Sequence, residues 1–307
     1  MKSNTNYQLG IMNHFLRYTF YLLFISSSLL SQVTTEQIYH GARSMALAGS
    51  NVANAKDVFA GFRNPAALTE LSRISSAVSF TQASGLSYLP HSMFGVSVPL
   101  GKRGTAGISA ENLSVSVGST VLTQEMAIAA HYGFYLQKDR NSSLAIGVSA
   151  KYLSVNYGKS AGVSGDGFDG VDLGESQTFG IDLGFQASLR NRHKMGVFVK
   201  NINRPKLGKA SLVDLPRSID IGLAYSPYNL VWTTFSLRRS AGYDTQYGAG
   251  LEYELIPGFT VRSGVHSNPN RLGAGFSLSV KGITVDYGLL THPILSLTHQ
   301  VSIGVEI

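Results

Sequence analysis

The feature that most constrains this chain is an alternation of apolar with small or polar residues, repeated from about residue 74 to residue 307. Residues 178–189 are an example: every odd position from Phe179 to Leu189 is apolar, with Thr, Gly, Asp, Gly, Gln and Ser between them. Successive side chains of a β-strand point to opposite faces, so each such segment predicts a strand with one apolar and one polar face. The repetition predicts an all-β fold.

The alternating segments number about 14, and most are near the roughly 9–11 residues that a tilted strand needs to cross a bilayer. Their connections alternate in length: those after even-numbered segments are tight, whereas those after odd-numbered segments are mostly longer, led by about 157–176 and 203–216. Membrane barrels have short turns on the periplasmic rim and longer loops outside, a parity that a soluble β-sandwich has no physical reason to keep. The expected segments are 74–82, 92–100, 104–117, 124–137, 142–157, 176–190, 194–202, 216–226, 229–238, 245–255, 259–266, 271–280, 283–290 and 296–306. We therefore predict a closed antiparallel transmembrane β-barrel in the outer membrane, over residues 73–307.

The polar faces of the strands carry charged residues, and these charges indicate whether the polar faces point to the lipid or to the lumen. An Arg or Lys that met lipid near the midplane would cost about 2–4 kcal/mol, so the charged face must line the lumen, where opposite charges can pair. We expect a charge network that rigidifies the barrel; a selective ion path and a buried active site are the alternatives. The predicted lumen residues are Lys151, Asp182, Lys200, Asp220, Glu252, Glu254, Arg262, Arg271, Asp286 and Glu306.

Composition agrees with this fold and excludes several function classes. Charged residues are only 14% of the chain, Gly numbers 33, and beyond the N-terminus no run approaches the roughly 20 apolar residues of a transmembrane helix. There is no Cys, which excludes disulfides, thiolate zinc sites, thiol catalysis and lipoprotein acylation. The net charge of +7 comes from scattered residues rather than a basic arm or helix, so we expect no nucleic-acid partner.

The N-terminus reads as an export signal. Residues 1–31 hold Lys2 and Arg17, then an apolar stretch from Tyr18 to Leu30, then Ser31 before a polar start. A basic region, a short apolar core and a small residue are the pattern of a secretory signal peptide, and the core is too short for a membrane anchor. We expect cleavage after Ser31.

Residues 32–72 break the alternation. Small residues are dense from Gly41 to Ala55, and Asn64-Pro65 marks a turn at which Pro65 can begin a short helix. Such small residues let one backbone lie close against another, as an inserted plug requires. We therefore expect a small N-terminal hatch segment over residues 32–72.

The run from Gly41 to Leu68 resembles the N-terminal signature of the FadL and PorV superfamily of outer-membrane barrels. Members read small-Arg-x-x-small-hydrophobic-small-Gly, then a short acidic stretch, then Asn-Pro-Ala. The resemblance implies about 14 strands with the N-terminal segment folded inward as a hatch. It also implies that Asn64, Pro65 and Ala66 form the hatch turn, with Arg43 and Gly49 in support.

The chain departs from the family pattern at two places. The usual acidic pair is reduced to Lys56-Asp57, and the chain ends in Ile307 where many outer-membrane barrels end in an aromatic residue. The first departure affects the detail of the hatch, and the second affects recognition by the standard insertion signal.

No catalytic signature is present, so we expect no enzyme and no cofactor. HExxH, GxSxG, Walker A and Cys/His metal spacings are absent from the sequence. The loop that holds Asp166, Asp169 and Asp172 is a weak calcium candidate, because its spacing misses the EF-hand template and Asp-Gly pairs commonly form plain turns.

Two hypotheses of function follow. The first is a PorV-like interaction subunit of type IX protein secretion or of outer-membrane assembly, with protein partners; the many inward charges favour it. The second is a FadL-like channel for hydrophobic small molecules, which needs an apolar pocket at the hatch and a lateral opening at a strand kink. The hatch residues that would line such a pocket, or form the core of the hatch itself, are Met45, Leu47, Val58, Phe59 and Phe62.

Overall fold

A computed structural model describes residues 39–117, 120–160, 162–163, 165, 169–208 and 212–307. The expected export signal, residues 1–31, and the first part of the expected hatch segment lie outside these ranges. Within them, no helix has the length and apolar character needed to cross a membrane.

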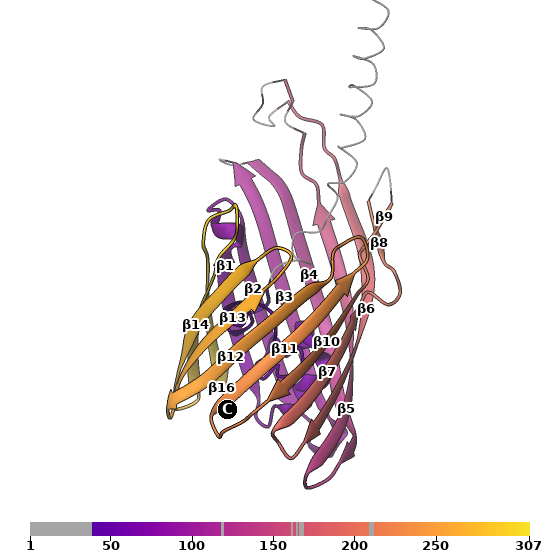
Figure 1. Ribbon diagram of the computed structural model, residues 1–307. Helices are drawn as coiled ribbons and strands as arrows, with labels where there is room; N and C mark the ends of the chain where they lie inside the picture. The colour runs from indigo at the N-terminus through magenta and orange to yellow at the C-terminus, as the bar shows by residue number, and fades with distance from the viewer. Residues whose placement is uncertain (1–38, 118–119, 161, 164, 166–168, 209–211) are drawn as a thin grey trace, which may run out of the picture.

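The described strands close into a 14-membered antiparallel barrel, in which each strand pairs with its sequence neighbour and β1 pairs with β16 (Figure 1). The predicted fold class is confirmed. A separate two-stranded ribbon, β8 (Lys206–Leu207) with β9 (Val213–Asp214), lies in the connection between β7 and β10. The barrel strands are β1 (Ser75–Gln82), β2 (Pro90–Pro99), β3 (Thr105–Val117), β4 (Thr120–Lys138), β5 (Ser142–Asn156), β6 (Glu175–Leu189), β7 (His193–Lys200), β10 (Ser218–Tyr225), β11 (Val231–Ser240), β12 (Gln246–Ile256), β13 (Phe259–His266), β14 (Arg271–Val280), β15 (Ile283–Leu290) and β16 (Thr298–Glu306).

The turns differ between the two ends of the barrel. One end, here called the short-turn end, holds the tight β2–β3, β4–β5, β6–β7, β10–β11, β12–β13 and β14–β15 connections, together with the start of β1 and the end of β16. The opposite end, here called the outer end, holds the long connections over 157–174 and 201–217. One connection differs from the expected parity: β3 and β4, which are 13 and 19 residues long, are separated in sequence by residues 118–119 only.

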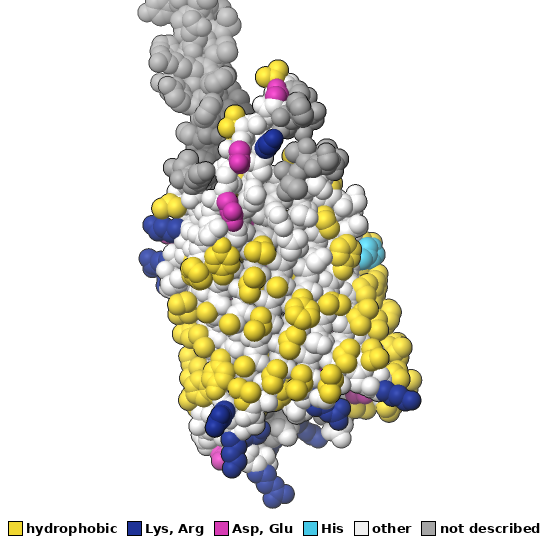
Figure 2. Space-filling model, turned by 180° about the vertical axis from the view of Figure 1, so that it is seen from behind, with side chains coloured by type: hydrophobic (Ala, Val, Ile, Leu, Met, Phe, Trp, Pro, Cys, Tyr) yellow, Lys and Arg dark blue, Asp and Glu magenta, His cyan; other side chains and the backbone are white. Residues whose placement is uncertain are grey.

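The outer face of the barrel is apolar. Alternate side chains of the strands point outward and are exposed, among them Phe179, Ile221 and Leu272. In space-filling view they form a belt around the middle of the molecule, with Lys, Arg, Asp and Glu near the two ends (Figure 2). A soluble protein rarely leaves so large an apolar surface uncovered, whereas acyl chains cover it in a bilayer.

The N-terminal segment, residues 39–71, lies inside the barrel (Figure 1). It contains two short α-helices, α2 (Ala42–Ala46) and α3 (Ala60–Arg63), and the 3-10 helix η3 (Pro65–Glu70). Helix α2 contacts β13 to β16, and η3 contacts β3 to β6 on the opposite wall. The segment therefore spans the lumen from wall to wall. Two further 3-10 turns, η4 (Ala83–Gly85) and η5 (Gly101–Arg103), connect barrel strands.

Inward-facing glycines of the wall make room for this segment. A Cβ added at Gly147 would lie 2.2 Å from the backbone nitrogen of Ala66, and one at Gly264 would lie 2.3 Å from the carbonyl carbon of Leu47. Such distances leave no space for a side chain, so the wall and the segment touch backbone to backbone. The wall glycines whose added Cβ would meet the segment, either its backbone or, at Gly95 and Gly250, its side chains, are here called the glycine belt: Gly95, Gly133, Gly147, Gly184, Gly196, Gly222, Gly250, Gly264, Gly273 and Gly288.

Candidate functional site

A cavity of about 210 Å³ lies on the outer side of the N-terminal segment. The segment forms its floor with Tyr39, His40, Ser44, Phe62 and Arg63. Barrel strands and outer connections form its wall. The wall residues are Phe198, Lys200, Pro216, Ser218, Asp220, Arg238, Ser240, Tyr243, Gln246, His266, Asn268, Pro269 and Arg271. A molecule in this outer cavity would therefore touch the segment that closes the barrel.

Asp220 of β10 joins the floor of this cavity to its wall. Its carboxylate accepts from Arg63 Nη1 of the segment at 2.6 Å and from Arg238 Nε of β11 at 2.8 Å. Arg63 also donates to the carbonyl of Gly49, within the segment. The pairing satisfies a carboxylate that is only 1% exposed, and unpaired burial would be costly.

A group of buried His and Glu side chains lies beside the floor. Glu111 of β3 is 3.2 Å from His40 Nε2 and 3.1 Å from His91 Nε2, and the ring of His40 stacks on Phe62 at 4.3 Å. Burial lowers the pKa of His40, although Glu111 acts in the opposite direction. His131 lies between the hydroxyls of Ser109 and Ser149, at 2.6 and 2.7 Å.

Across the described ranges, no group of three or more His, Cys, Asp or Glu side chains is placed to hold a metal ion. Of the three Asp residues of the weak calcium candidate, Asp166 lies outside the described residues. Asp169 accepts from the Val163 amide at 3.0 Å and Asp172 from the Gly174 amide at 2.8 Å, as turn-forming carboxylates do.

A second cavity, of about 220 Å³, lies on the other side of the segment, toward the short-turn end. Four charged residues are linked along its wall. Arg43 of α2 donates to both carboxylate oxygens of Glu252, at 2.9 and 3.2 Å. Arg262 is 2.6 Å from the same carboxylate and 3.0 Å from Asp286. Arg43 thus attaches the segment to β12, and Arg262 extends the network to β13 and β15.

A third attachment lies at the end of η3. Lys194 of β7 is 2.5 Å from Glu70, which also accepts from Gln186 at 2.6 Å. The ring of Trp232 lies near two ammonium groups, Lys56 Nζ at 4.4 Å and Lys194 Nζ at 4.9 Å from its centre. Trp232 is the only Trp of the chain and contacts a residue of the segment.

The residues expected to form the hatch turn lie at the start of η3. Asn64 accepts from the Ala66 amide at 3.2 Å and donates to the carbonyls of Val52 and Phe185, at 3.0 and 3.1 Å. Pro65 occupies the first position of η3, where its missing N–H costs nothing. Gly49 has a φ of 73°, a conformation that favours glycine.

The apolar hatch residues separate into three environments. Met45 and Leu47 are 1% and 0% exposed and line neither cavity. Phe62 lines the outer cavity, whereas Val58 and Phe59 line the second one. They do not form one apolar pocket together.

The ten predicted lumen residues occupy several parts of the lumen. Glu252, Arg262 and Asp286 are linked, as described above, while Lys200, Asp220 and Arg271 line the outer cavity. The remaining four lie elsewhere along the wall. Lys151 is buried, Asp182 accepts from the Asn201 amide at 2.7 Å, Glu254 accepts from the Gly258 amide at 3.0 Å, and Glu306 is exposed at the short-turn end.

Sequence reasoning missed Arg63, Glu70, Glu111 and Lys194, which attach the segment to the wall. Glu111 and Lys194 lie on the inward faces of expected strands, so the alternation that found the other charges also applied to them. Arg63 and Glu70 flank the Asn-Pro turn, and no local pattern shows which wall residue each one meets.

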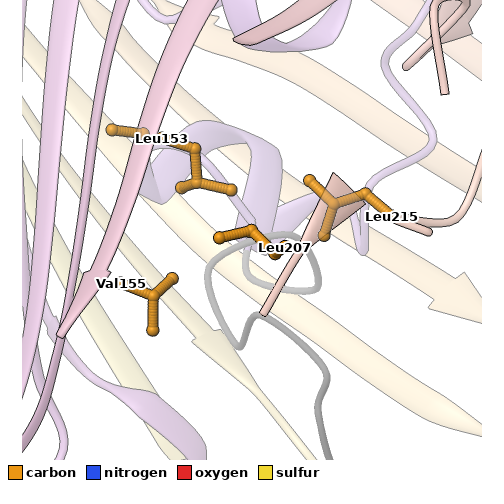
Figure 3. Packing of buried hydrophobic residues seen from close by; sticks show 5 residues of the cluster. Leu153, Val155, Leu207 and Leu215 are labelled. Atoms are coloured by element: carbon orange, nitrogen blue, oxygen red, sulfur yellow. The ribbon is translucent and has the colours of Figure 1, made fainter. Parts of the chain in front are cut away.

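The outer mouth is narrowed by the connection between β7 and β10. Leu207 and Leu215 of this connection pack on Leu153 and Val155 of β5 (Figure 3). Ala127 of β4 completes the cluster. The connection thus folds over the β4–β5 side of the barrel rather than projecting freely from it.

The channel hypothesis also required a lateral opening at a strand kink. The shifts in strand register lie near strand ends, at Val115/Ser116, Tyr135/Gln137 and Glu254/Ile256. The seam between β6 and β7 differs, because its regular ladder runs only from Leu183 to Leu189 of β6. Beyond Leu183, Asn203 takes the place of a strand and bonds to the Ile181 amide and the Phe179 carbonyl.

No family model matches this chain, and no curated protein matches it in sequence. Solved structures do match in fold. The monoaromatic hydrocarbon channel CymD aligns with a TM-score of 0.63 at 15% identity, over 87% of this chain and 97% of its own. The toluene transporter TbuX of Ralstonia pickettii aligns at 0.59 and 12% identity, over 87% and 98%. A FadL homologue of Pseudomonas aeruginosa aligns at 0.55 and 12% identity, over 87% and 97%.

The chain has the FadL-type barrel fold. The match covers most of both chains, so it includes the barrel as a whole rather than a few strands. Together with the apolar belt, the FadL-type fold makes this an outer-membrane β-barrel. None of the three matched structures is named as a secretion subunit or an enzyme.

Proposed function

We propose that this protein is an outer-membrane channel for small, largely hydrophobic molecules, closed by its N-terminal segment. The observation that carries the proposal is the outer cavity, whose floor is the closing segment itself. Aromatic side chains from both partners meet there: Tyr39 and Phe62 from the floor, Phe198 and Tyr243 from the wall. Aromatic rings are common in the lining of a small-molecule site. Here they share the lining with charged side chains, among them Lys200, Arg238 and Arg271.

Passage requires the segment to move. The glycine belt holds the segment in close contact with the wall, and the two cavities lie on opposite sides of the segment. A ligand that contacts Tyr39 and Phe62 can shift the segment only if it binds better to the displaced state than to the closed one. The ion pairs of Arg43, Arg63 and Glu70 with the wall set the free energy that this preference must exceed.

The secretion-subunit hypothesis loses the argument that favoured it. That hypothesis relied on the inward charges, because a barrel whose lumen is lined by charged residues can be stable without conducting anything. Several of these charges hold the segment in place, as with Glu252 and Asp220, and a closed channel needs the same attachments. Inward charge therefore no longer separates the two hypotheses, and the matched folds are those of hydrocarbon channels.

A disulfide that ties the segment to the wall tests the proposal. Ser50 Oγ of the segment is 2.8 Å from Thr234 Oγ1 of β11, and the chain has no Cys of its own to compete. We expect oxidised Ser50→Cys with Thr234→Cys to lower uptake of radiolabelled toluene by Gram-negative cells to the level of cells without the protein, and reduction to restore it. Whole cells are needed because toluene enters a plain phospholipid bilayer unaided.

The matched control ties wall to wall. Ser279 of β14 and Thr284 of β15 are paired in register, and their hydroxyl oxygens are 2.9 Å apart. Oxidised Ser279→Cys with Thr284→Cys should transport normally. Equal uptake by the oxidised and reduced Ser50/Thr234 variant would refute a channel closed by this segment, as would the absence of uptake by the unmodified protein.

A further inference from the structure

The short-turn end carries basic side chains over one half of its circumference. They occupy the residues before β1 and the turns β2–β3, β4–β5 and β6–β7, which are adjacent around the barrel. All of them are exposed. We call this set the basic arc: Arg73, Lys102, Arg103, Lys138, Arg140, Arg190 and Arg192.

Few acidic residues neighbour the basic arc: Glu70 and Glu306 line a cavity together with Arg73, and the turns hold one more. Asp139 is the acidic residue within these turns, and its carboxylate accepts from Gln137 at 2.6 Å and from Ser142 at 3.3 Å. In the part of the chain that the structure describes, no ion pair involves a residue of the arc. Lys138 lies over the ring of Tyr135 at 4.3 Å, which leaves its charge uncompensated.

The turns that carry the arc are nevertheless ordered by hydrogen bonds. The carbonyl of Arg103 accepts from the hydroxyl of Tyr132, and the carbonyl of Arg192 accepts from the Ser226 amide at 2.8 Å. The amide of Arg190 donates to Asn141 of the next turn at 2.5 Å. The backbone positions from which these side chains project are therefore ordered along the rim.

The arc lies directly beyond the apolar belt. Leu100, Leu136 and Leu189, each within two residues of an arc residue in sequence, are exposed apolar residues of the barrel surface. Figure 2 shows Lys and Arg side chains gathered below the belt, with fewer acidic side chains among them. Because the belt marks the acyl chains, the arc lies at the depth of the phosphate groups of the adjacent leaflet.

The other half of the short-turn end is different. Its turns expose apolar side chains, including Tyr228, Leu230 and Ile256, and the basic residue Lys281. The positive charge is thus concentrated on the side of β1 to β7, rather than spread evenly as general solubility would require.

We propose that the basic arc binds the headgroups of anionic phospholipids in the periplasmic leaflet. A partner of the arc must carry negative charge, reach the rim from the side and have an apolar part that can contact the belt. A phospholipid with a net negative headgroup meets all three conditions. Exposed guanidinium groups suit phosphate oxygens, which they can bond in pairs. Binding on one side would hold the short-turn end at a set depth in the membrane.

The test compares lipid selectivity in nanodiscs that contain equimolar phosphatidylcholine and phosphatidylglycerol, with a spin label on either lipid. We expect the full chain to immobilise labelled phosphatidylglycerol several-fold more than labelled phosphatidylcholine, and high salt to reduce the preference. The variant Lys102→Gln, Arg103→Gln, Arg190→Gln, Arg192→Gln should lose it.

A control of equal charge change uses the outer end. Lys159, Arg204, Arg217 and Arg239 are exposed there, and their replacement by Gln should leave the preference intact. Heat-modifiable migration on a gel checks that each variant is folded. If both variants lose the preference for phosphatidylglycerol equally, the preference depends on net charge alone and the proposal is overturned. Unchanged selectivity in the arc variant would do the same, as would arc-dependent binding of an acidic periplasmic protein without lipid preference.

Discussion

Arg63 of the N-terminal segment and Asp220 of β10 form an ion pair of 2.6 Å between residues 157 positions apart in sequence. Arg238 shares the same carboxylate from the neighbouring strand. One buried wall residue thus holds the floor of the outer cavity, and the stability of the closed state depends on it.

Replacement of Asp220 should destabilise the barrel and release the N-terminal segment from the wall. Asp220→Asn leaves Arg63 and Arg238 without their carboxylate, and removal of one partner of a buried pair costs about 3–5 kcal/mol. Urea titration of the folded form, followed by heat-modifiable migration, measures the change. Arg239→Gln, next to Arg238 but exposed, is the control and should unfold like the unmodified protein.

A side chain in the glycine belt should open the channel. Gly147→Ala places a Cβ at 2.2 Å from the Ala66 amide nitrogen, and overpacking of this kind costs about 1–3 kcal/mol. We expect faster leakage of small antibiotics into cells that carry the variant. Gly304→Ala supplies the comparison, because the nearest atom to its Cβ is 3.6 Å away. Equal leakage from both variants would show that tight packing of the segment does not control permeability.

The fluorescence of Trp232 should report movement of the segment. Lys56, which belongs to the segment, lies over its ring, so displacement of the segment exposes the indole to solvent. We expect toluene to increase quenching of Trp232 by acrylamide in the unmodified protein. In the oxidised Ser50/Thr234 disulfide variant, toluene should not increase the quenching. If it does, the change in fluorescence comes from the barrel wall and not from movement of the segment.

Acid should favour release of the segment. Burial lowers the pKa of His40, so the closed state binds fewer protons at this group than the released state, in which the pKa returns to near 6.5. The contribution of His40 to closure is therefore fully present above pH 6.5 and declines as the pH falls below it. Glu111, His91 and Lys200 also act on His40.

Acrylamide quenching of Trp232 between pH 8 and pH 5 measures this release, and His40→Gln isolates the contribution of one group. The variant should show a weaker pH dependence than the unmodified protein. If the pH profiles of His40→Gln and the unmodified protein coincide, protonation of His40 does not contribute to release of the segment.

The alternation placed many Gly residues on the inward faces of the strands. In the structure most of the belt glycines meet the backbone of the N-terminal segment, while Gly95 and Gly250 meet its side chains. The sequence alone could not pair Gly147 with Ala66, because nothing local relates positions so far apart.

The charges show the same limit. Glu252, Arg262 and Asp286 were expected in the lumen, and they are linked there. Arg43 was expected to support the hatch, but its bond to Glu252 across the lumen depends on how the segment is threaded through the barrel. Arg63 and Glu70 were missed, because a charged residue in an irregular segment carries no periodicity.

The sequence by itself determined the closed barrel, its two faces and the approximate strand boundaries, because a period of two and the cost of charge in lipid are local constraints. The tertiary structure decided which residues meet inside the lumen: the attachments at Asp220, Glu252 and Lys194, the position of the outer cavity and the grouping of the basic arc. These depend on closure, which brings distant strands and the threaded segment within contact distance, and no local pattern encodes such distances.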